Sequence, residues 1–136
     1  TLSSSSAASD VYKRQDISVR ILKEAKKRVK EYSNTAVIIA DTDYTPFSND
    51  TFDAVFAVTL LQNMPKPKQT LNEMKRVTKQ NTIIVVTGLK KAFSRKEFTQ
   101  LLREAGLKIK VLKLNENLKE YIAICTKILK ENLKRT

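Results

Sequence analysis

Histidine and tryptophan are absent from this 136-residue sequence, and cysteine occurs once, at Cys125. A single cysteine excludes a disulfide within the chain and is typical of a reducing compartment, so we expect a cytoplasmic protein. Without histidine, the chain alone cannot assemble a histidine-dependent catalytic triad or the usual kind of zinc site. We therefore predict no metal site and assign no catalytic side chain.

Long hydrophobic runs are also missing. No stretch approaches the roughly 20 apolar residues that a helix needs to span a bilayer. The N-terminus lacks the apolar centre of a signal peptide. These two absences predict a chain without a membrane span, and its length fits one domain or part of one.

Acidic residues are few relative to basic ones, with 14 Asp and Glu against 26 Lys and Arg, for a net charge of +12. An excess of this size is compatible with a nucleic-acid partner. The alternative is a lysine-rich solvent surface, because most lysines lie in helical patterns that also carry glutamate. We favour the second interpretation, also for the cluster Lys26-Lys27-Arg28-Lys30.

The first 15 residues differ from everything that follows. They are rich in serine and alanine and have no apolar period, which predicts disorder. Residues 10–15, DVYKRQ, also resemble a translated sequencing adaptor. We interpret residues 1–15 as non-native, residues 16–128 as a partial domain and residues 129–136 as a basic tail that frays.

The remaining sequence alternates strand and helix patterns in the order α-β-β-α-β-α-β-β. Ser18 is expected to cap a first helix whose apolar stripe recurs at helical spacing. The next helices have clearer signals, with Pro67 suited to a first turn, a capping box from Ser94 to Glu97, and Gly106 at a C-terminal cap. Five strands are predicted, at residues 36–40, 53–58, 82–88, 107–114 and 120–127.

Continuous apolar strands that alternate with helices indicate an α/β fold with a parallel sheet. The last two strands have no helix between them, so they should form an antiparallel hairpin. Cys125 alternates with apolar neighbours on the last strand and is expected to be buried. Phe47 is expected to cap the core, with the lining of a substrate mouth as the alternative for Phe47 and Tyr44.

Several short motifs occur in the order of a known family. These are DIS before a helix, then AD…TPFSNDTFD, then LLQNM, then EMKRVTK followed by a strand. Together they resemble the class I S-adenosylmethionine-dependent methyltransferases, most closely the branch that includes quinone-biosynthesis enzymes. The resemblance covers residues 16 to about 127. It implies a partial Rossmann-like sheet, mostly parallel with a C-terminal antiparallel hairpin, and methyl transfer from S-adenosylmethionine to a small-molecule acceptor.

The resemblance also implies a cofactor site past the carboxyl ends of the strands. Asp16 would accept from the ribose hydroxyls, Asp41 from the adenine amine with Thr42 beside it, and Val58 and Thr59 would lie by the methionine part. Each residue has a structural alternative. Asp16 could be an acid favoured by a helix dipole, Asp41 a turn aspartate, and Val58 and Thr59 core packing at a strand end.

The sequence departs from the family pattern at two points. The family's glycine-rich loop is missing, because the two glycines, Gly88 and Gly106, stand far apart. Its KPGG turn is replaced by Lys79-Gln80-Asn81, where asparagine tolerates a left-handed backbone. We expect a C-terminal fragment of a larger enzyme that is inactive by itself. The alternative function is a small basic α/β module that binds nucleic acid without catalysis.

The family's strand order makes a specific prediction about the sheet. Strands 53–58, 82–88, 120–127 and 107–114 should be neighbours in that order. The run 36–40 should either pair directly beside 53–58 or stay loose, and the chain should self-associate through the bare edge of 53–58. The methyl acceptor and the oligomeric state are not set by the sequence.

Overall fold

The computed structural model describes residues 8–128, with side chains from residue 19 onward. The chain divides into two compact units, Thr1–Pro46 and Phe47–Thr136. The tail at 129–136 and the first seven residues lie outside the described part, so the predictions for them are not tested.

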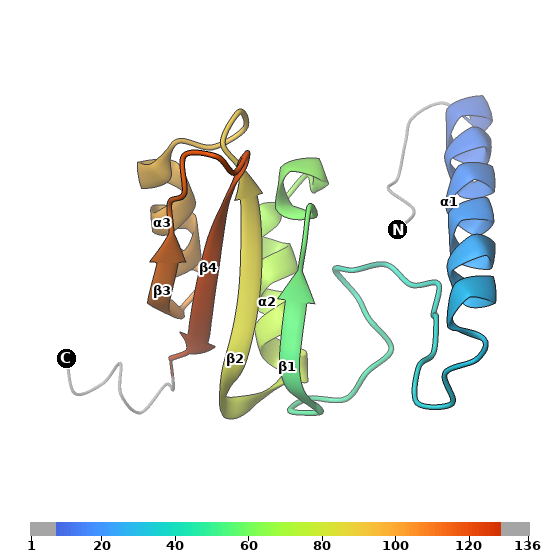
Figure 1. Cartoon of the computed structure of the whole chain (residues 1–136), viewed down its shortest axis with the longest axis horizontal. Coiled ribbons are helices and arrows are strands. Elements are labelled where there is room, and N and C mark those ends of the chain that lie inside the picture. Colours follow the sequence, from blue (N-terminus) through green and yellow to red (C-terminus); the bar gives the residue numbers. More distant parts are fainter. Residues whose placement is uncertain (1–7, 129–136) are drawn as a thin grey trace. The chain divides into compact units, whose positions relative to one another are not determined.

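The first unit contains one long helix, α1, at Ala8–Val29 (Figure 1). We expected disorder up to residue 15 and a helix starting after Ser18, and that boundary was wrong. Neither proline nor glycine occurs between residues 8 and 29, so nothing interrupts the helical backbone. Its last turns carry exposed basic residues, and Arg28 pairs with Glu24 at 3.5 Å.

The run at 36–40 is not a strand in this structure, which corrects the prediction of a first buried strand. The side chains of Ile38 and Ile39 are 51% and 56% exposed. A β-branched run becomes a strand only when a neighbour pairs with its backbone, and no strand pairs with this run among residues 8–128. The second of the two expected outcomes, a loose run, is therefore the one observed.

The second unit is built on a four-stranded sheet with the order β1-β2-β4-β3 (Figure 1). Its strands are β1 Phe52–Ala57, β2 Thr78–Leu89, β3 Leu107–Lys113 and β4 Glu120–Lys127. β1 and β2 are parallel, whereas β4 is antiparallel to both β2 and β3. The four strands predicted to form the sheet, their order and the hairpin are thus confirmed, and the sheet is mixed because β4 alone is reversed.

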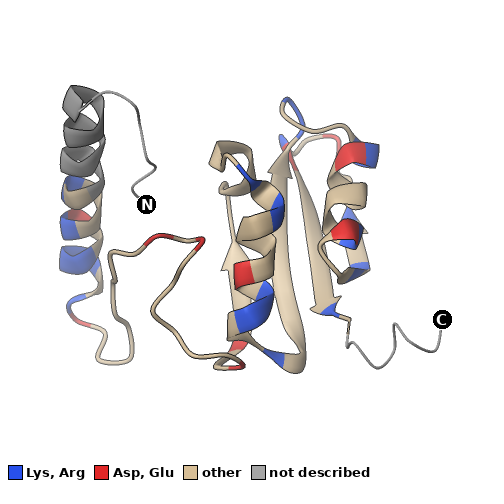
Figure 2. Ribbon diagram, turned by 180° about the vertical axis from the view of Figure 1, so that it is seen from behind, with Lys and Arg blue, Asp and Glu red and all other residues tan. Residues whose placement is uncertain are grey.

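Two helices, α2 at Pro67–Val77 and α3 at Arg95–Glu104, cover one face of this sheet (Figures 1 and 2). Pro67 lies in the first turn of α2, and Ser94 and Glu97 form the predicted capping box of α3. Gly106 follows α3 with φ of 80°, as expected for a residue just past a helix end. A short 3₁₀ helix, η1 at Leu61–Asn63, connects β1 to α2.

The core lies between the sheet and these helices, and Phe98 of α3 is at its centre. The ring of Phe98 stacks on Tyr121 at 5.5 Å between centroids. A Cβ atom at Gly88 would come within 2.5 Å of the same ring, so glycine is required for this close approach of β2 to α3. Cys125 is fully buried in this core, as predicted.

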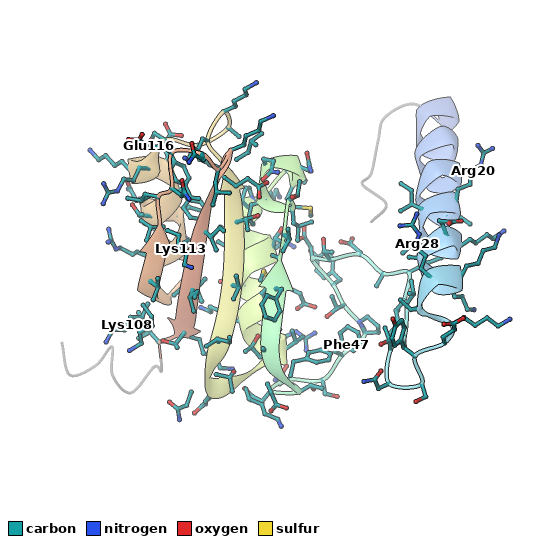
Figure 3. All side chains as sticks on the ribbon, in the orientation of Figure 1. Arg20, Arg28, Phe47, Lys108, Lys113 and Glu116 are labelled. Carbon is teal, nitrogen blue, oxygen red and sulfur yellow. The ribbon has the colours of Figure 1, made fainter. Side chains whose placement is uncertain are left out.

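The two outer edges of the sheet differ in chemistry. The β3 edge carries Lys108, Lys110 and Lys113, two of which are labelled in Figure 3. At the opposite edge, β1 presents Phe56, whose side chain is 64% exposed, and no lysine. Lysines on an edge strand oppose pairing with another strand, so only the β3 edge is protected in this way.

Candidate functional site

The carboxyl end of β1 has an unusual backbone at Thr59. Its φ is 55°, in the left-handed region, where β-branched residues are rare because the side chain crowds the backbone. Such strain costs on the order of 1–3 kcal/mol and persists only where the surroundings enforce it. The strained residue is one of those predicted to lie beside the cofactor.

Hydrogen bonds with three other residues hold Thr59 in this conformation. The Thr59 amide donates to Oγ1 of Thr87 on β2 at 2.9 Å. Its hydroxyl donates to Oε1 of Glu120 on β4 at 3.2 Å, and its carbonyl accepts from Nδ2 of Asn63 at 3.2 Å. The amide and the hydroxyl proton of Thr59 are therefore both engaged within the protein.

This arrangement sets the direction of the preceding carbonyl. The peptide between Val58 and Thr59 is planar and trans, so the Val58 carbonyl points opposite to the Thr59 N–H. Because that N–H points at Thr87, the Val58 carbonyl points away from β2. The Val58 side chain is 63% exposed, which excludes core packing as its role.

A residue that the sequence did not single out lies in the same turn. Oε1 of Gln62, in η1, is buried and has no hydrogen-bond partner among the described residues. An unpaired buried acceptor is costly, so such a group is either tolerated strain or waits for a donor. No sequence signal marks it, because its burial depends on how η1 packs on β2 and α2.

Asp41 and Thr42 lie in a turn of the first unit. The amide of Asp43 donates to Oδ1 of Asp41 at 2.9 Å, and the amide of Tyr44 donates to the Asp41 carbonyl at 3.1 Å. The turn-aspartate alternative is thus satisfied, although a carboxylate has further acceptor capacity. Asp41 does not follow a strand, since residues 36–40 form none.

Asp16 lies inside α1, eight residues after its start. We expected this acid just before the first helix, and that placement was wrong because the helix extends further toward the N-terminus. The side chain of Asp16 is outside the described part of the structure. Its proposed role in binding ribose is therefore not tested.

Near the start of β1, a second polar cluster holds the loop that leads into this strand. Arg76 donates through Nε and Nη2 to both carboxylate oxygens of Glu73, at 2.6 and 2.9 Å, and through Nη1 to Asn49. The hydrogen bond to Glu73 raises the pKa of Arg76. Phe47 packs edge-on against Phe52 at 4.9 Å, but neither ring belongs to the core or to the residues packed against it, so the expected capping of the core by Phe47 is not observed.

Two kinds of site are not found in the part of the chain that is described. No group of three or more histidine, cysteine, aspartate or glutamate residues is placed to hold a metal ion there. No helix within residues 8–128 is both long and apolar enough to cross a membrane. Basic and acidic residues are interspersed along α2 and α3 (Figure 2).

Comparison with known proteins agrees with this fold. Residues 5–86 match the family described as methyltransferase domain. Over 70 residues the chain is 37% identical to a demethylmenaquinone methyltransferase from Lysinibacillus sphaericus, a match that covers 52% of this chain and 30% of that protein. The chain thus spans about a third of that relative's length.

Solved structures show the same architecture. A methyltransferase dependent on S-adenosylmethionine from Aquifex aeolicus superposes with a TM-score of 0.71 at 16% identity, covering 79% of this chain and 64% of that one. The trans-methyltransferase CalH in complex with SAH gives a TM-score of 0.66 at 17% identity, covering 78% of this chain and 39% of that one. With the family match extending over more than half of the sequence, this chain belongs to the methyltransferase domain family.

Proposed function

We propose that this chain contributes cofactor-binding residues to an enzyme that transfers a methyl group from S-adenosylmethionine to a small-molecule acceptor. The observation that carries the proposal is the strained turn at Thr59, at the carboxyl end of a parallel strand in a chain of this family. Ligands of open α/β sheets bind past the carboxyl ends of the strands. Strained backbone is concentrated at such functional sites.

The proposed roles follow the chemistry of each group. Asp16 accepts from the two ribose hydroxyls, and Asp41, with Thr42 beside it, accepts from the adenine amine. Val58 and Thr59 border the methionine part. Since the Thr59 amide is bound to Thr87, the backbone group offered there is the Val58 carbonyl, which accepts from an ammonium.

The reaction needs little chemistry from the protein. S-adenosylmethionine supplies a methyl group on a positively charged sulfur, which an acceptor nucleophile displaces in line. The protein orients the two reactants and excludes water. The absence of histidine from the sequence is therefore compatible with this activity.

For the acceptor we propose a quinone-like small molecule, because the curated relative is a demethylmenaquinone methyltransferase. The buried, unpaired oxygen of Gln62 is a group that a hydroxyl of the acceptor can donate to. Binding of nucleic acid through the net charge of +12 is the competing outcome.

The test uses a chimera that places the part of the L. sphaericus relative preceding its matched region in front of residue 16. In that protein Asp16→Ala should weaken S-adenosylhomocysteine binding by about tenfold or more, since hydrogen bonds to charged groups contribute about 1.5–3 kcal/mol. Lys27→Ala is the matched control and should leave binding unchanged. Equal losses in both variants, measured by calorimetry, would contradict the assignment of Asp16.

The 136-residue chain itself should bind the cofactor only weakly. The sequence has no glycine-rich loop, so the close backbone approach to the cofactor that such a loop allows is missing. Calorimetric titration with S-adenosylmethionine checks this. A dissociation constant in the low micromolar range would show that the prediction is wrong.

A further inference from the structure

We propose that Thr87 and Glu120 are positioning residues of the cofactor site, which act by holding Thr59 in its left-handed conformation. The inference rests on the proposed function and assigns two residues that no sequence motif marks. Neither residue is assigned a contact with the cofactor. Both act through the turn that follows β1.

Thr87 and Glu120 hold Thr59 from two different strands. Thr87 comes from β2 and Glu120 from β4, and they engage the backbone amide and the side-chain hydroxyl of Thr59 respectively. Thr87 is 5% exposed, so its hydroxyl is held in a fixed position. A strained backbone conformation persists when several independent hydrogen bonds enforce it, whereas a single hydrogen bond would not maintain it.

The end of β1 departs from regular strand pairing. A regular continuation of the strand would pair Val58 with the backbone of β2. Instead the ladder stops at Ala57, which pairs with Val86, and the next bond goes to a side chain, Oγ1 of Thr87. This exchange of a backbone acceptor for a side-chain acceptor fixes the direction of the Val58 carbonyl, as derived above.

Threonine is unsuited to the left-handed backbone of position 59 unless its side chain is used. Glycine adopts positive φ without cost, and asparagine tolerates it. A threonine is advantageous at this position only through its hydroxyl, which donates to Glu120. The Glu120 carboxylate on β4 therefore stabilises the strained backbone of Thr59.

The experiment uses the ¹⁵N-labelled full chain and variants at Thr87. Thr87→Val removes the acceptor at nearly constant volume, and Thr87→Ser retains it. Thr99→Val is the matched control, because the Thr99 hydroxyl bonds only within α3, to carbonyls of Arg95 and Lys96. Amide hydrogen exchange and the three-bond coupling of Thr59 report its conformation, and titration with millimolar S-adenosylhomocysteine reports weak binding.

Thr87→Val should accelerate exchange of the Thr59 amide by about tenfold and move its coupling away from the left-handed value. It should also raise the dissociation constant for S-adenosylhomocysteine by about tenfold, whereas Thr87→Ser and Thr99→Val should behave as the unmodified chain. Glu120→Leu should act like Thr87→Val, and Glu120→Gln, which keeps an acceptor oxygen, should restore binding.

Unchanged binding in Thr87→Val would overturn the inference, and so would binding that falls equally in Thr99→Val. If the ligand shifts the amides of Asp41 and Thr42 but not those of Val58 and Thr59, this inference fails while the proposed function stands. If no amide of the unmodified chain shifts at millimolar ligand, the dissociation constants are compared in the chimera instead, where unchanged binding in Thr87→Val overturns this inference and leaves the proposed function standing.

Discussion

Gln62 is only partly buried as a residue, but the oxygen of its side chain, Oε1, is buried. Its Oε1 has no partner among residues 8–128, and a buried acceptor without a donor costs about 1–3 kcal/mol. Gln62→Met should therefore raise the free energy of unfolding by about 1 kcal/mol, measured by urea denaturation.

The control for this prediction is Gln100→Met. Gln100 lies exposed on α3 and bonds to Glu104, so its substitution should change stability by less than about 0.5 kcal/mol. If Gln62→Met is destabilising, its oxygen has a partner in solution. A stabilised variant with weakened acceptor binding in the chimera would mark Gln62 as a functional residue.

The ionisation of the Cys125 thiol is governed by its burial alone. Desolvation raises the pKa of its thiol from 9.0 to about 11. At pH 9 the thiol of the unfolded chain is half ionised and that of the folded chain is about 1% ionised, so alkylation by iodoacetamide should be about fiftyfold slower in the folded chain. Rates measured with and without urea check this, and equal rates would contradict it.

The raised pKa of Cys125 also makes the free energy of unfolding depend on pH. The neutral thiol is favoured in the folded state, so the contribution is fully present below pH 9. It is lost as the pH rises through the folded pKa of about 11, because the unfolded chain releases its proton first. The loss should be absent in Cys125→Ala, which separates it from the titration of lysines.

At the scale of elements, Lys127 joins segments that are distant in sequence. From the end of β4 its ammonium donates to Oδ1 of Asp50 at 2.6 Å, to the Lys75 carbonyl at 3.1 Å and to the Thr78 carbonyl. Its side chain is 13% exposed, whereas that of Asp50 is half exposed. It therefore closes the C-terminal end of α2, mainly through carbonyls that water cannot easily reach.

Lys127→Met should lower the free energy of unfolding by about 2–3 kcal/mol, because it keeps the apolar stem and leaves those carbonyls without a donor. Denaturant unfolding followed by circular dichroism measures the effect. Lys113→Met, at an exposed position of β3, is the control and should change stability by less than about 0.5 kcal/mol. Similar effects in the two variants would show that the Lys127 contacts contribute little.

The start of β2 follows α2 directly, although the sequence there differs from the KPGG turn of the family. Within β2, Thr78 pairs with Phe52 and regular pairing resumes only at Ile83, so residues 79–82 bulge out of the ladder. Asn81 has φ of 61°, which confirms the expectation that asparagine takes a left-handed position there. Lys79 bonds back to Asp53 on β1 at 3.0 Å, an exposed pair that contributes little stability.

At the scale of the molecule, the asymmetry of the sheet edges predicts how the chain associates. The β3 edge is protected by lysines, whereas β1 exposes Phe56 and has β2 as its one neighbour among the described strands. Phe56→Lys should therefore reduce self-association of the chain, measured by sedimentation velocity. Val111→Lys, on the protected side, should have a smaller effect, and a larger one would place the association elsewhere.

The local elements of this fold were determined by the sequence itself. The capping box of Ser94 and Glu97, the proline that opens α2 and the turn at Asn81 each depend on neighbours within a few residues, so a short window contains the whole cause. The strand order was predicted through family resemblance and is confirmed. The burial of Cys125 followed from alternation along one strand.

Other features were decided only by tertiary structure. Residues 36–40 have a strand composition, but a strand needs a paired neighbour, and none is present for them among the described residues. The restraint on Thr59 joins residues 28 and 61 positions away, so no local pattern could reveal it. A left-handed threonine contradicts the backbone preference of a β-branched residue. Only the hydrogen bonds that Thr59 makes to two other strands can make this conformation stable.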